Sequence, residues 1–136
     1  MNPIGVVAAL ATFLSVWFGH VSVRKVEFIS ATIWIPAAIF TTLGLIVGFL
    51  SLSTTNRPLS VALGILSITL LIDALEFRRQ QNRVKKGHAP ANPNNPRHAR
   101  ILQEYTSATT QDLLKRDPIE HSLSTEKTTN PISNYE

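Results

Sequence analysis

The composition of residues 59–87 constrains this chain more than any other feature. Its first fourteen positions, residues 59–72, carry no charged side chain. Asp73 and Glu76 follow, and then comes a basic run that stops at Gly87. An apolar run of about 20 residues is long enough to cross a bilayer as a helix. The pattern therefore predicts the last of several membrane-spanning helices, continuing beyond the bilayer into water.

Two further apolar stretches, residues 3–23 and 31–52, have the length of a membrane span. A cleaved signal peptide is not expected, because Arg24 and Lys25 follow the first apolar core instead of preceding it. A buried hairpin of a soluble protein would need a second protein layer, and the rest of the chain is too polar to supply one. We predict an all-α integral membrane protein with spans at 3–23, 31–52 and 59–77, the third helix extending to residue 87.

Charge divides the chain into two parts. Residues 1–77 hold six of the 22 charged side chains, and residues 78–136 hold the other sixteen. Proline and asparagine dominate residues 88–100, where they disfavour helix and sheet, so we expect an extended linker there. Residues 101–136 read as a polar tail, mostly disordered, with a weak helix over residues 101–116.

Basic residues near the spans predict the orientation. The loop after the first span carries Arg24 and Lys25, whereas the loop between the second and third spans carries only Arg57. The positive-inside rule then places the N-terminus outside and the tail in the cytoplasm. The basic run after the third span is also a candidate contact for anionic lipid head groups. Its members are Arg78, Arg79, Arg83, Lys85 and Lys86.

Small residues recur at helical spacing in each span. Such stripes let helix backbones approach closely in lipid, where the hydrophobic effect does not drive helices together. The spacing leaves open whether they pack within the chain or against another subunit. The candidates for helix packing are Ala11, Ser15, Gly19, Gly44, Gly48, Ser60 and Gly64.

A cluster of ionisable residues is expected at the cytoplasmic boundary, since the three-span topology brings its members to one depth. Its members are His20, Arg24, Lys25, Glu27, Asp73, Glu76 and Arg79. One interpretation is structural: Glu27 and Glu76 accept salt bridges from Arg24, Lys25 or Arg79 and tie the helix ends together. The other is a proton or ion relay through His20, Asp73 and Glu76.

Several kinds of chemistry find no support in the sequence. The chain has no cysteine, and its four histidines are too far apart for a local metal motif. His20 is the one histidine within a predicted span that could ligate a haem or chlorophyll-type cofactor axially, and it has no partner ligand. No nucleophile motif, phosphate-binding glycine loop or metalloprotease pattern occurs. We expect no enzyme activity, no catalytic residue, no metal and no cofactor, and no nucleic-acid binding, because the basic run lacks interleaved aromatic residues.

The order of motifs resembles the bacterial membrane proteins of the domain of unknown function 4491 family. The matching pieces are Thr12-Phe13, Gly19-His20-x-x-Val23-x-Lys25-x-Glu27-Phe28, Leu63-Gly64, Glu76 and Arg83-Val84-x-Lys86-Gly87-x-x-Pro90-x-Asn92-Pro93. Phe28 replaces a usual tyrosine, His88-Ala89 replaces an aromatic pair, and Asp73 is an added acid. The resemblance implies a three-helix protein of the bacterial inner membrane, and it implies no activity.

Two functional hypotheses follow. The first is a structural or accessory subunit that packs against other membrane proteins or against itself within the bilayer. The second is a small oligomeric transporter or ion conductor that uses the boundary cluster. The orientation of Asp73 distinguishes them, because a position facing a cavity between helices favours the second, and a position facing Arg24 or lipid head groups favours the first.

Overall fold

The computed structural model describes residues 3–113 and 115. Within that part of the chain the elements are α1 (Ile4–Ile29), α2 (Trp34–Ser53), α3 (Arg57–Lys85) and α4 (Pro96–Glu104). The first three are long and apolar enough to cross a membrane. The predicted all-α fold with three apolar helices is thereby confirmed, although α1 continues six residues beyond the expected end of its span.

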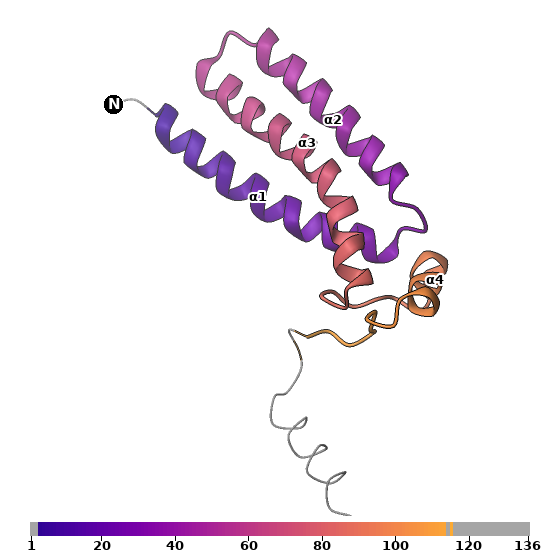
Figure 1. Cartoon of the computed structure of the whole chain (residues 1–136). Coiled ribbons are helices and arrows are strands. Elements are labelled where there is room, and N and C mark those ends of the chain that lie inside the picture. Colours follow the sequence, from indigo (N-terminus) through magenta and orange to yellow (C-terminus); the bar gives the residue numbers. More distant parts are fainter. Residues whose placement is uncertain (1–2, 114, 116–136) are drawn as a thin grey trace, which may run out of the picture.

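Helix α3 is the central element of the bundle. It packs against both α1 and α2, which run along either side of it (Figure 1). Large apolar side chains point outward from the bundle, among them Phe13, Phe49 and Leu75, each about two-thirds exposed. This distribution is the reverse of a soluble helical protein, and it suits a surrounding of lipid chains.

Helices α2 and α3 meet through small residues at their middle. The Ser67 hydroxyl donates a hydrogen bond of 2.8 Å to the carbonyl oxygen of Gly44. A methyl group in place of the Gly44 hydrogen would lie 2.9 Å from Leu71, and one on Gly48 would lie 2.8 Å from the Ser67 hydroxyl. The two glycines therefore permit an approach that alanine would obstruct.

The same two helices are joined again next to their connecting loop. The Ser51 hydroxyl donates to the Ser60 carbonyl, and the Ser60 hydroxyl donates to the Ser51 carbonyl, both at 2.8 Å. Gly64 lies one turn further along α3, where an added Cβ would be 3.3 Å from the Ser51 hydroxyl. Ser60 and Gly64, two of the predicted small residues, thus lie between helices of one chain. The hydroxyl groups of Ser51 and Ser60 each bond the other residue's carbonyl, so neither group needs water.

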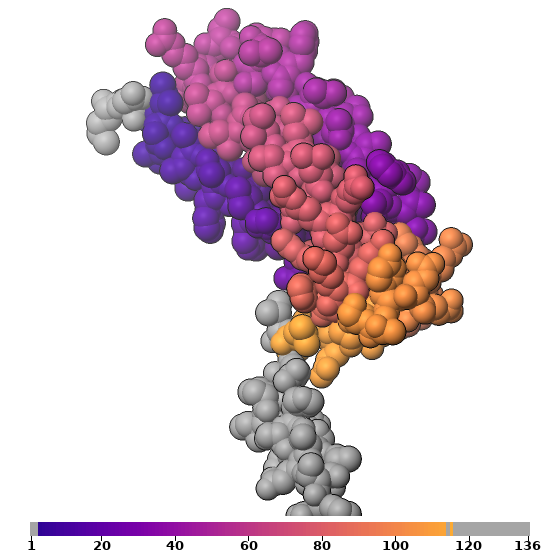
Figure 2. Space-filling model, viewed as in Figure 1, coloured from indigo at the N-terminus to yellow at the C-terminus, as the bar shows by residue number. Residues whose placement is uncertain are grey.

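Helix α3 ends where the chain turns back on itself. Gly87 has a φ of +72°, and a side chain there would overlap the backbone carbonyl of Ser107. Residues 86–113, which we call the cap, fold against the end of α3 (Figure 2). The Ala91 amide donates to the Thr109 carbonyl at 2.8 Å, which joins the two ends of the cap. Its apolar centre, Ala89, Ala91 and Ile101, packs against Val84 of α3.

The cap corrects two expectations. Residues 88–100 were expected to be an extended linker, yet α4 begins at Pro96. Proline is tolerated at the first helical turn because its missing amide has no partner there, and Asn95 caps the helix by accepting from the Arg97 amide at 3.0 Å. The expected helix over residues 101–116 ends at Glu104, and the chain after it turns back to Ala91, whose amide donates to the Thr109 carbonyl. The remainder of the expected disordered tail, residues 116–136, lies outside the described residues.

Candidate functional site

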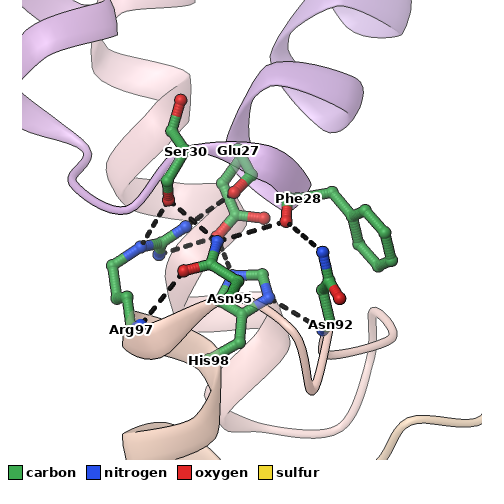
Figure 3. Close-up of polar contacts among 7 residues, drawn as sticks. All are labelled: Glu27, Phe28, Ser30, Asn92, Asn95, Arg97 and His98. Carbon is green, nitrogen blue, oxygen red and sulfur yellow. Dashed lines mark hydrogen bonds and ion pairs between the residues drawn. The ribbon is translucent and has the colours of Figure 1, made fainter.

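A buried polar junction joins the end of α1 to the cap. On one side are Glu27, Phe28 and Ser30, and on the other are Asn92, Asn95, Arg97 and His98 (Figure 3). We call these seven residues the Glu27 junction. Glu27 is 1% exposed and His98 is fully buried. The two sides are separated by more than sixty positions in the sequence, so the junction depends entirely on the tertiary fold.

Glu27 is bound by two side chains of α4. Its Oε1 atom lies 2.9 Å from Arg97 Nη1 and 3.0 Å from His98 Nε2. The Arg97 guanidinium also donates to the Glu27 backbone carbonyl at 2.6 Å. One arginine thus binds both the carboxylate and the main chain of the same residue, which fixes the position of α4 relative to α1.

The hydrogen bonds of His98 define its tautomer. The Asn92 backbone amide donates to His98 Nδ1 at 2.9 Å, so this nitrogen must present a lone pair. The proton is therefore on Nε2, which donates to Glu27 Oε1. We infer a neutral imidazole that orients Glu27, so that the charge on the carboxylate is balanced by Arg97. The Phe28 ring lies edge-on to the imidazole, with 6.2 Å between ring centroids.

The junction also closes the C-terminal end of α1. A helix leaves its last carbonyl groups without intrahelical partners. Here Asn95 Nδ2 donates to the carbonyls of Phe28 and Ser30 at 3.2 and 2.9 Å, and Asn92 Nδ2 donates to Phe28 at 3.1 Å. Arg97 Nε adds a bond of 3.3 Å to the Ser30 carbonyl. The cap therefore supplies the hydrogen bonds that a free helix end would take from water.

Glu76 forms a second ionic site on α3. Its carboxylate lies 3.2 Å from Arg79 Nη1 and 3.1 Å from Arg83 Nη2. The pairing with Arg79 was expected from the sequence, and Arg83 joins it from one turn further on. The two arginine side chains are 70% and 53% exposed, so this site is open to water where the Glu27 junction is closed.

Asp73 lies apart from both ionic sites. It is 5% exposed, and its carboxylate lies against Gly19 of α1, where a Cβ would overlap it. In residues 3–113 no hydrogen bond reaches this carboxylate; its electrostatic neighbours are His20 and Glu76. Asp73 lines a cleft of about 390 Å³ between α1 and α3. By the criterion set out from the sequence, a position facing such a cleft favours the second hypothesis.

The wall of the cleft is apolar apart from Asp73 and a few hydroxyls. Ala11, Ser15 and Gly19 line it from α1, so this predicted small-residue stripe lies between helices of the same chain. The Ser15 hydroxyl donates to the Ala11 carbonyl at 2.6 Å, and Thr69 donates to the Ile65 carbonyl at 2.9 Å. Asp73 is the one charged group among the residues that line the cleft.

The expected boundary cluster is divided in the structure. His20, Arg24 and Lys25 have exposed side chains, and Glu27 pairs with neither of the two basic neighbours assigned to it. Lys85, a predicted lipid contact, lies 4.9 Å from the centre of the Tyr105 ring, while Arg78 and Lys86 are exposed. No three His, Asp or Glu side chains come together to hold a metal within the described part of the chain.

Sequence reasoning missed Arg97 and His98, the two residues that hold Glu27. A signal was present, because Asn95-Pro96 is the combination of N-cap and first-turn proline that begins many helices. It would have predicted α4 with Arg97, His98 and Ile101 near one face. It would not have shown which carboxylate they meet, because that contact arises only when the cap folds back onto α1.

Comparison with known proteins assigns the chain to a family. No curated protein and no solved structure matches it. A family model does match, that described as "Domain of unknown function (DUF4491)", over residues 2–95. The match includes the three long helices and the α1 side of the junction, as well as Asn92 and Asn95, and it stops just before Arg97 and His98. The chain belongs to the DUF4491 family of domains of unknown function.

Proposed function

We propose that the protein is a non-enzymatic structural or accessory subunit of the bacterial inner membrane, which holds a folded cap in a fixed position at the cytoplasmic surface. The observation that carries this proposal is the Glu27 junction. Its carboxylate, imidazole and guanidinium are bonded to each other and to the backbone. Groups so fully bonded hold a structure together and are not free for chemistry.

The outer surface of the bundle supports an accessory role. Trp17, Ile35 and Phe49 are each more than half exposed and lie on two different helices. Lipid alone can cover such surfaces, and so can helices of a larger membrane protein. The cap would then act as a rigid contact at the membrane surface, with the basic residues near the end of α3 against anionic head groups.

The distribution of basic residues supports an orientation with the N-terminus outside and the cap in the cytoplasm. The ends of α1 and α3 lie together at the cap, which gathers Arg24, Lys25 and the basic run at one end of the bundle, while Arg57 lies at the other (Figure 1). The positive-inside rule assigns the cap to the cytoplasm and the N-terminus to the outside. Because the chain has no native cysteine, single cysteines at Thr55 and Thr106 test this assignment. We expect an impermeant maleimide to label Thr55→Cys in intact cells and Thr106→Cys only after lysis; the reverse result would contradict it.

The accessory role is tested by purification from native membranes in mild detergent, with quantification of co-purifying membrane proteins. We expect a stoichiometric partner with the wild-type chain. Replacing Arg97 by alanine, which releases the cap, should deplete that partner, whereas replacing the exposed Arg100 of the same helix should not. A wild-type chain that elutes without any stoichiometric partner, at a native expression level, would contradict the proposal.

The alternative, a small oligomeric transporter or ion conductor, is favoured by one observation, the position of Asp73 in the cleft. Glu27 and Glu76 give this alternative no further support, because both carboxylates are ion-paired. Proton or cation flux in liposomes would support this alternative if it depended on Asp73.

A further inference from the structure

Asp73 is a buried acid without the partners that buried acids normally have. Its exposure is similar to that of Glu76, 5% against 7%, yet Glu76 is ion-paired with two arginines. Among the described residues Asp73 forms no ion pair, and its basic electrostatic neighbour is the exposed His20. An ionised carboxylate in an apolar surrounding is costly unless it is paired. A positive charge supplied from outside the chain would remove that cost at this position.

The cleft around Asp73 restricts what could supply the charge. Small inorganic cations such as Ca²⁺ take six or more oxygen ligands, or retain several waters. The cleft offers one carboxylate and the hydroxyls of Ser15, Ser22 and Thr69, which are fewer side-chain oxygens than such a cation takes. Its remaining wall is built mainly of apolar residues such as Leu14, Phe18 and Leu66. These groups suit an apolar body that carries one positive centre.

We propose that the cleft between α1 and α3 binds an amphiphilic organic cation, with its positive centre at Asp73 and its apolar part against the two helices. The volume of about 390 Å³ falls within the range of small-molecule sites. Gly19 is required beside Asp73, because any side chain there would displace the carboxylate. This binding site is separate from the accessory role, which depends on the cap.

The test uses tetraphenylphosphonium as the probe, with tetraphenylborate as an anion of the same shape. Binding to the full-length chain in detergent is measured by isothermal titration. We expect saturable binding of the cation and none of the anion. Asp73→Asn should weaken cation binding by about tenfold or more, the effect of losing a charged partner. Glu76→Gln removes a carboxylate three positions away that is already ion-paired, so it should change the affinity for the cation less than threefold. The difference in affinity between the two variants is the informative result.

A second variant tests the cleft without touching the carboxylate. Ala62 lines the cleft on α3, so Ala62→Phe should fill part of it and weaken binding while Asp73 is retained. Each variant is first shown to elute and melt as the wild type does. The proposal is overturned if the wild type shows no saturable binding, if tetraphenylborate binds equally well, or if Asp73→Asn leaves the affinity unchanged. Unchanged affinity in Ala62→Phe would place the cation outside the cleft and overturn it as well.

Discussion

The Glu27 junction and the Asp73 cleft each contain a buried carboxylate, and they differ in what surrounds it. Glu27 is bound by an arginine and a histidine of α4, and asparagine side chains donate hydrogen bonds to the backbone carbonyls beside it. Asp73 has a glycine beside it and an apolar cleft in front of it. Burial alone would rank the two acids alike, at 1% and 5% exposure.

The difference shows that the partners of a buried acid, more than its depth, indicate its role. A carboxylate whose oxygens are already bonded contributes to structure, and removing its partner leaves a costly unpaired charge. A carboxylate without partners contributes little to folding and is available to a ligand. Substitutions in the two regions should therefore affect different measurements.

The largest effect is expected for Arg97→Ala. The substitution leaves the Glu27 carboxylate buried without its cation and removes the bonds to the Glu27 and Ser30 carbonyls. We expect the docking of the cap to weaken by roughly 3–5 kcal/mol. Hydrogen–deuterium exchange in α4 should increase by orders of magnitude, while exchange in α2 changes little.

Arg100→Ala is the matched control, because it removes an exposed arginine from the same helix. Exchange in α4 should then stay close to the wild-type level. Equal exchange in both variants would mean that the Arg97 contacts do not hold the cap.

A smaller effect is expected for Asn95→Ala. Asn95 caps α4 and closes the end of α1 with two hydrogen bonds, but it carries no charge. We expect a loss of about 1–3 kcal/mol in cap docking. The neighbouring Asn94 has an exposed side chain, so Asn94→Ala provides the control and should remain near the wild type by the same exchange measurement. A cap that stays fully protected in Asn95→Ala would contradict the role given to this amide.

The smallest effect is expected for Glu76→Gln. Its two arginine partners are largely exposed, and water replaces much of what the pair provides. We expect a change in stability of about 0–1 kcal/mol, measured as the melting temperature in detergent. A loss as large as that of Arg97→Ala would show that the Glu76 site is as closed as the Glu27 junction.

The sequence was sufficient to predict the three long apolar helices. The long uncharged runs predicted α1, α2 and α3, because only a helix satisfies its own backbone within lipid. The small-residue stripes predicted close helix contacts without deciding between this chain and another subunit, and in the structure Gly44 and Gly48 lie against Ser67 of α3. In these regions the structure follows from patterns within a few turns of one helix.

The cap could not be predicted in the same way. Residues 88–113 have few apolar side chains and many prolines and asparagines, which locally resemble a linker. Their order comes from bonds to α1 and α3, such as those of Asn95 to Phe28 and Ser107 to Lys85. The charge pattern likewise placed Glu27 among nearby basic residues, although its partners come from 70 positions away. Long-range pairing of this kind leaves no periodic signal in the sequence.

The most direct test of this account compares Glu27→Gln and Asp73→Asn, each assayed for melting temperature and for tetraphenylphosphonium binding on the same preparation. Glu27→Gln should melt below the wild type, since Arg97 loses its counter-charge, and should bind the cation normally. Asp73→Asn should melt within a few degrees of the wild type and lose binding. If Asp73→Asn melted as low as Glu27→Gln, or if Glu27→Gln also lost the cation, the two carboxylates would not have the separate roles assigned to them.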